Sequence, residues 1–201
     1  IQKNTSQITK TLKSPKTIKD PVIIYTYDSK PKKLGGNPNN NLAKALETAI
    51  EQILAFNKTE GKDSQKQEIL LLGRFGFDGK NLERSSLFEY NEYGNKIKCL
   101  KYPNLKITFM TAHASKGLGY DNVIIINCKN ETYGFPSKIE NDPVLNYVDK
   151  RDDSIEAAEE RRLFYVAMTR TKNRVFFIAP EGNPSEFLLE IKHDYKNVVL
   201  K

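Results

Sequence analysis

The chain has 201 residues, of which 38% are hydrophobic and 28% charged, a composition typical of a globular domain rather than a disordered segment. No apolar run approaches the roughly 20 residues of a membrane-spanning helix, so we expect no membrane partner. Two cysteines cannot build a disulfide scaffold, and we expect the reducing cytoplasm. The net charge of +7 permits an anionic partner such as nucleic acid without requiring one.

The first 60 residues predict one strand and one helix. Residues 1–20 are polar and lysine-rich, and we expect a partial N-terminal helix or linker there. The β-branched and aromatic run Val22–Tyr27 predicts a strand. After a predicted loop at residues 30–41, apolar residues recur with helical spacing from Leu42 to about Asn57. Because the first residue is Ile1 rather than Met, we also expect a piece of a longer protein.

Short apolar runs alternate with helical patterns in the rest of the chain. The predicted strands are residues 69–72, 97–102, 107–111, 123–127 and 175–179. The predicted helices are residues 82–88, 155–171 and 184–192, with a polar loop at 131–153. This alternation is typical of an α/β domain with a mostly parallel sheet, in which ligands bind outside the carboxyl ends of the strands.

A phosphate-binding loop of the form G-x-x-x-x-G-K-[ST] is absent from the sequence. The nearest candidate is Gly79-Lys80, but Arg74 stands where the first glycine is required and Asn81 replaces the Ser/Thr. No apolar strand ends in a pair of acidic residues that could hold Mg²⁺. We therefore expect that this chain alone does not hydrolyse nucleotide efficiently.

The first informative segment is TAHASKGLGYD, residues 111–121, which begins where a predicted strand ends. Hydroxyl, imidazole and ammonium donors follow one another closely, and small residues permit a tight backbone. Such a loop can present donors to a phosphodiester backbone. The alternative is a helix N-terminus that Ser115 caps, with His113 as a structural residue.

The second segment is AEERRLFYVAMTRTK, residues 158–172, which has a helical composition. Leu163, Val166, Ala167 and Arg170 are spaced three and four apart, so one stripe can be buried, and residues 159–162 can form an exposed face with paired charges. Arg170 comes at the end of this helix, just before a buried strand. It could point into an inter-domain cleft and stabilise a transferring phosphoryl group, or it could be an ordinary C-terminal arginine.

Taken together, TAHASKGLGYDNVII followed by EERRLFYVAMTRTK resembles motifs V and VI of superfamily 1 DNA helicases of the UvrD/Rep type. The similarity is greatest to the helicase IV (HelD-like) branch, and residues 109–111, 134–136 and 183–185 fit that branch too. The resemblance covers residues 68–192 well and the first 60 weakly.

The resemblance implies a RecA-like three-layer sandwich, which is a P-loop NTPase-like fold without its own phosphate-binding loop. Residues 1–201 would form a single C-terminal RecA-like (2A) domain. Family motif IV would lie before Ile1. Only 36 residues separate Arg74 from Thr111 (111 − 74 − 1), so the large 2B insertion is absent. ATP and Mg²⁺ would be bound mainly by a preceding 1A domain, so this chain alone is not expected to be active.

The resemblance also implies roles for individual residues. Single-stranded DNA would contact Thr111, His113 and Lys116. Arg170 would act as an arginine finger that reaches the γ-phosphate of ATP, and Arg74 would lie near the DNA track. Glu160 and Arg161 would organise the helix rather than touch ligand. Gly119 stands where UvrD-type helicases carry a ribose-contacting glutamate, so we exclude that contact.

The implied function is that of a motor domain of an ATP-dependent DNA helicase or translocase of DNA repair type. Its partners would be single-stranded DNA, ATP and the 1A domain of the same protein. The alternative is a non-motor binding module that associates with DNA or, like HelD-like factors, with RNA polymerase. A nuclease–helicase subunit is a third reading, but no nuclease carboxylate constellation follows the second motif.

Overall fold

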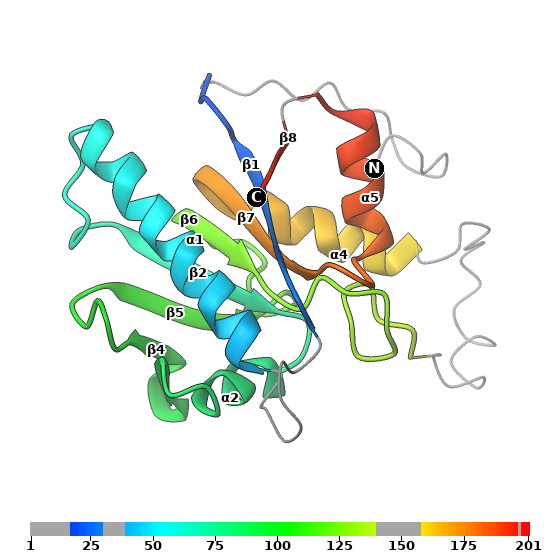
Figure 1. Cartoon of the computed structure of the whole chain (residues 1–201), viewed down its shortest axis with the longest axis horizontal. Helices are drawn as coiled ribbons and strands as arrows, with labels where there is room; N and C mark the ends of the chain where they lie inside the picture. The colour runs from blue at the N-terminus through cyan, green and yellow to red at the C-terminus, as the bar shows by residue number, and fades with distance from the viewer. Residues whose placement is uncertain (1–16, 30–38, 140–157, 197) are drawn as a thin grey trace.

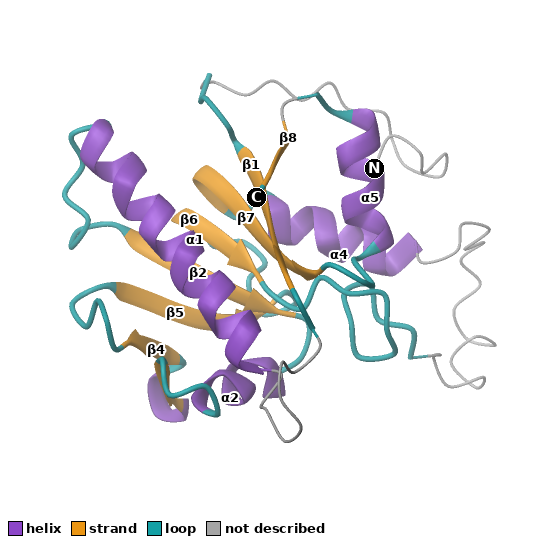
Figure 2. Cartoon of the chain, in the orientation of Figure 1, coloured by secondary structure: helices purple, strands orange, loops and turns teal. Residues whose placement is uncertain are grey.

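A mixed eight-stranded sheet runs through the part of the chain that the computed structural model describes, which is residues 17–29, 39–139, 158–196 and 198–201. The strands are β1 Val22–Tyr27, β2 Glu68–Gly73, β3 Phe88–Asn91, β4 Lys96–Cys99, β5 Lys106–Thr111, β6 Tyr120–Ile125, β7 Thr171–Pro180 and β8 Val198–Leu200. The helices are α1 Asn39–Thr59, α2 Phe77–Glu83, α4 Ala158–Met168 and α5 Glu186–Asp194, with a short 3₁₀ turn, η1, at Glu92–Gly94. Figures 1 and 2 show their arrangement.

The sheet order is β3-β4-β5-β2-β6-β7-β1-β8, and from β5 to β8 each strand pairs in parallel with the next one in this order. Strand β4 alone is reversed, because it pairs antiparallel with both β3 and β5. The central strands are buried on both faces, which explains why residues such as Leu70 and Leu71 form continuous apolar runs. The predicted mostly parallel α/β sheet is confirmed.

Two separate apolar cores give the fold its three layers. Alternate residues of β2 point to opposite faces, so Ile69 and Leu71 join the core under α1, whereas Leu70 and Leu72 join the core under α4 and α5. Figure 1 shows α1 lying across one face of the sheet. The predicted three-layer α/β sandwich is thus confirmed. Among the described helices, none combines the length and the apolar character that a membrane span needs.

Several predicted boundaries differ from the structure. The short helix expected at residues 82–88 is α2, which runs from Phe77 to Glu83 instead, because Phe88 pairs with Cys99 in the β3–β4 hairpin. The strand expected at residues 97–102 ends at Cys99. Strands β3 and β8 were not predicted. Residues 1–16, 30–38 and 140–157 lie outside the described residues, and with them most of the predicted N-terminal helix, both polar loops in part and the start of the helix at 155.

Candidate nucleic-acid interface

The carboxyl ends of β2 and β5 meet at one edge of the sheet. Gly73 is the register partner of Thr111, and the Ala112 N–H donates a hydrogen bond of 2.9 Å to the Gly73 carbonyl. Arg74 follows Gly73 directly. The parallel sheet therefore brings Thr111 and the start of the segment after β2 together, at the edge where open α/β sheets bind ligands.

Residues 112–119 form the connection from β5 to β6, and this connection consists of tight turns rather than a helix. The Ser115 hydroxyl is buried and donates to the Ala112 carbonyl at 2.7 Å, while the Ala114 N–H donates to the Thr111 hydroxyl at 3.3 Å. His113 and Lys116 are exposed. The alternative of a helix N-terminus capped by Ser115 is therefore wrong, and two of the predicted DNA contacts face solvent.

Helix α4 packs on the sheet through a stripe that matches the predicted one only at Leu163 and Ala167. Its buried residues are Ala158, Leu163, Phe164 and Ala167. The Phe164 ring stacks on Phe177 of β7 at a centroid distance of 5.4 Å and meets the edge of Phe135 at 5.0 Å. Val166 is only partly buried, whereas Phe164, which the predicted stripe omits, lies at its centre.

The first turn of α4 is fixed to the end of β2 by an ion pair. The Arg74 Nε and Nη2 donate to the Glu160 carboxylate at 2.9 and 2.6 Å, and the Ser137 N–H donates to the same carboxylate at 2.9 Å. Both side chains are mostly buried, with 17% and 13% of their surface exposed. The arginine predicted to lie near DNA is thus engaged by α4, and Glu160 organises this helix as expected.

The predicted exposed charged face of α4 is only partly exposed. Arg162 and Glu159 pair on the surface as expected. Arg161 instead reaches α5, where it pairs with the Glu190 carboxylate at 2.5 Å and lies over the Phe187 ring. Arg161 therefore holds two helices together rather than facing solvent.

Arg170 lies at the opposite edge of the sheet from Thr111, where β6 and β7 begin. Its Nε donates to the Val166 carbonyl at 2.8 Å, and its Nη1 donates to the Leu118 carbonyl at 3.1 Å. The Tyr120 N–H donates in turn to the Arg170 carbonyl at 2.9 Å. The structure therefore joins Arg170 to the far end of the 112–119 connection and not to Thr111 or Arg74.

Sequence reasoning missed a buried carboxylate at the edge of the sheet where β2 ends. Asp78 is fully buried, and its two oxygens accept hydrogen bonds from the Phe75 N–H at 2.9 Å and the Asn127 side-chain amide at 2.6 Å. Burial raises the pKa of this carboxyl. Gly73 is required beside it, because a Cβ there would lie 2.7 Å from the Asp78 side chain. The Gly-Arg-x-x-x-Asp spacing is the one sequence signal for this turn, and its meaning depends on the distant Asn127.

A buried arginine was missed as well. Arg174 of β7 has 5% of its side chain exposed and donates to Glu60, just past α1, at 2.5 Å, with its guanidinium over the Phe56 ring. This hydrogen bond holds the pKa of Glu60 below its usual range. The partners are 114 residues apart in the chain, so the contact fixes α1 to the sheet in a way no local pattern indicates.

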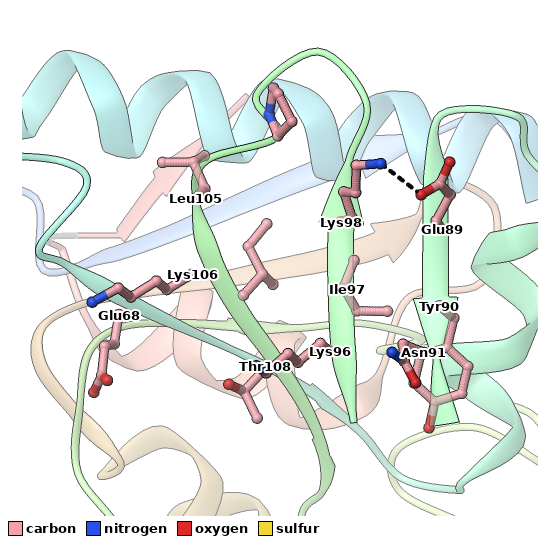
Figure 3. Close-up of a pocket in the computed structure, with 12 residues that line it drawn as sticks. Glu68, Glu89, Tyr90, Asn91, Lys96, Ile97, Lys98, Leu105, Lys106 and Thr108 are labelled. Atoms are coloured by element: carbon pink, nitrogen blue, oxygen red, sulfur yellow. Dashed lines mark hydrogen bonds and ion pairs between the residues drawn. The ribbon is translucent and has the colours of Figure 1, made fainter. Parts of the chain in front are cut away.

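A hollow lies elsewhere, over the face of β3, β4 and β5 (Figure 3). It has a volume of about 680 Å³ and is lined mainly by polar side chains, among them Lys96, Lys106 and the paired Lys98 and Glu89. Thr111, His113, Lys116, Arg74 and Arg170 do not line it. Over the described ranges, no three His, Cys, Asp or Glu side chains come close enough to hold a metal ion.

Comparison with known proteins gives consistent matches. Residues 39–182 match the family of UvrD-like helicase C-terminal domains. The chain is 33% identical to DNA helicase IV of Escherichia coli K12 over 151 residues, which is 73% of this chain and 19% of that protein. It is 34% identical to the ATP-dependent DNA helicase PcrA of Staphylococcus aureus over 95 residues, which is 42% of this chain and 12% of that protein. The chain thus spans less than a fifth of these relatives.

Proposed function

Since this chain belongs to the family of UvrD-like helicase C-terminal domains, we propose that it is the 2A motor half of an ATP-dependent DNA helicase or translocase. The observation that supports this most is the hydrogen-bonded link between two segments that the motor needs to couple. The connection that follows Thr111 includes Leu118, whose carbonyl accepts a hydrogen bond from Arg170. DNA and nucleotide contacts would thus share one connection.

The DNA-binding part of the proposal rests on Thr111, His113 and Lys116. All three lie at or just past the carboxyl end of β5, and His113 and Lys116 are exposed. A hydroxyl, an imidazole and an ammonium group can all donate to phosphate oxygens without reading base sequence. Binding is therefore expected to be sequence-tolerant and to weaken as salt rises.

The nucleotide part of the proposal rests on Arg170. Its Nη1 and Nη2 bond to the Leu118 carbonyl and the Thr169 hydroxyl in partly exposed positions, so the guanidinium can exchange these partners for a phosphate. ATP and Mg²⁺ would be held mainly by a 1A domain of the same protein, because this chain has no phosphate-binding loop. Arg170 would add positive charge to the γ-phosphate across the domain interface.

Single-strand-stimulated ATP hydrolysis by the full-length protein tests this function. Arg170→Ala is expected to lower the stimulated rate by about a thousandfold, the scale of an arginine finger, while leaving affinity for single-stranded DNA within about twofold. Arg162→Ala is the matched control, because Arg162 lies on α4, the helix just before Arg170, in an exposed pair with Glu159. That variant is expected to keep the wild-type rate.

Two results would contradict the motor proposal. One is the absence of stimulated hydrolysis in the wild-type protein. The other is a stimulated rate that Arg170→Ala and Arg162→Ala leave equally unchanged. Either result would favour the binding module, for which association with DNA or RNA polymerase would then be measured directly.

A further inference from the structure

Three aromatic rings meet near the edge of the sheet where β2 and β5 end. Phe75 and Phe77 stack in parallel, with ring centroids 5.1 Å apart and planes 6° apart. The Tyr133 ring stands edge-on to both, at centroid distances of 5.8 and 5.9 Å. Phe77 keeps 42% of its surface exposed and Tyr133 keeps 55%. We call Phe75, Phe77 and Tyr133 the aromatic cluster.

Hydrogen bonds and close backbone contacts hold both loops that carry the cluster. Asp78 accepts from the Phe75 N–H, which holds the turn after β2. Tyr133 comes from the loop after β6, where Gly134 donates its N–H to Glu131 at 2.9 Å. A Cβ at Gly134 would lie 1.9 Å from the Lys129 carbonyl oxygen, so this loop has little room to change. The fold therefore holds the three rings in place, although Phe77 and Tyr133 are exposed.

The cluster adjoins the residues that we propose to bind phosphate. Phe75 is two residues past Gly73, and Gly73 pairs with Thr111 in register. The Arg74 guanidinium lies over the Phe75 ring, 4.9 Å from its centroid, which places a positive charge against the stack. The cluster and the proposed phosphate contacts therefore follow neighbouring strands at the same edge of the sheet.

We propose that the aromatic cluster stacks a base of the bound single strand, with Phe77 and Tyr133 as the contacting rings. Every base presents a π-face, so this contact adds affinity without sequence preference. Two partly exposed rings are too small a surface for a stable protein partner, which needs roughly 800 Å² on each side. The inference rests on the proposed function, because it assumes a single strand at the end of β5.

Two DNA strands with the same number of phosphates, one with bases and one without, test the stacking contact. Affinity of the full-length protein would be measured for an oligo(dT) strand and for an abasic strand of equal length. Phe77→Ala and Tyr133→Ala are each expected to weaken oligo(dT) binding about fivefold or more, the effect of losing one stacked base, and to leave abasic binding unchanged. Tyr195→Ala is the matched control, since Tyr195 is 61% exposed and lies past α5, outside the cluster.

The outcomes separate the two proposals. If the wild-type protein binds neither strand, both the proposed function and the stacking contact are overturned. If it binds both strands and the cluster variants keep the wild-type ratio of the two affinities, only the stacking contact is overturned. Tyr133→Leu keeps an apolar side chain without the ring, so a loss of oligo(dT) affinity in this variant, with an unchanged thermal unfolding midpoint, excludes a folding defect as the cause.

Discussion

Two neighbouring glutamates of α4 differ sharply in their surroundings. Glu160 is 13% exposed and accepts hydrogen bonds from Arg74 and the Ser137 N–H, whereas Glu159 is 58% exposed and pairs with Arg162 on the surface. Glu160→Gln is expected to lower the free energy of unfolding by about 2 kcal/mol, because it weakens charged hydrogen bonds and leaves the Arg74 charge mostly buried. Urea denaturation of this chain measures the change.

Glu159→Gln is the control for that substitution. Solvent screens its pair with Arg162, so the free energy of unfolding is expected to change by about 0.5 kcal/mol or less. Equal effects at the two positions would show that the Arg74–Glu160 contact does not hold α4 on the sheet.

The same ion pair marks the limit of sequence reasoning at the residue scale. Arg74 was recognised as a residue at a strand end, which is where the structure has it. Its partner lies 86 residues away, and the local sequence cannot show that α4 begins beside it. For Arg170 the sequence predicted a helix to residue 171, whereas α4 ends at Met168. The bond from Arg170 to Leu118 could not be predicted, because the 112–119 connection had first to be placed against β7.

At the scale of elements, the 112–119 connection depends on one glycine. Gly117 has a φ of +84°, a conformation that residues with a Cβ rarely adopt. Gly117→Ala is expected to lower the free energy of unfolding by about 1 kcal/mol. The substitution is also expected to weaken the binding of single-stranded DNA, because Gly117 lies next to Lys116. Denaturation and oligo(dT) affinity measure the two effects.

Gly182→Ala is the matched substitution, because an added Cβ there would meet nothing within 4 Å and its φ is not in the left-handed region. We expect its stability to stay within about 0.5 kcal/mol of wild type. If Gly117→Ala is equally neutral, the connection is not constrained by that glycine, and the hydrogen bonds of Thr111, Ser115 and Arg170 have to hold it.

The elements that the sequence predicted best are those with a single strong signal. The run ILLL in β2 is buried on both faces, so any parallel sheet would include it. Strand β3 reads FEYN with a single fully buried residue, Phe88, and exists because β4 pairs with it. Strand β8 is three residues long and is defined only by its pairing with β1. Tertiary pairing, not local propensity, creates both.

For the whole molecule, the two edges of the sheet are expected to carry different contacts, DNA at one and nucleotide at the other, which the 112–119 connection couples. Thr111 ends β5 at one edge and Arg170 precedes β7 at the other, with residues 112–119 between them. Losing a phosphate contact at the first edge should therefore weaken the grip on DNA without impairing the chemistry at the second. In the full-length protein, Lys116→Ala is expected to raise the oligo(dT) concentration for half-maximal ATP hydrolysis, with the maximal rate unchanged.

The salt dependence of binding identifies the origin of that effect. Removal of one phosphate contact should reduce the slope of log affinity against log salt concentration by about 0.7 for a single strand. Lys98→Ala removes a lysine that is 52% exposed and pairs with Glu89 away from this edge, so it should leave both the slope and the half-maximal concentration unchanged. A fall in maximal rate for Lys116→Ala, with its DNA affinity unchanged, would instead mean that Lys116 acts on ATP hydrolysis rather than on the grip on DNA.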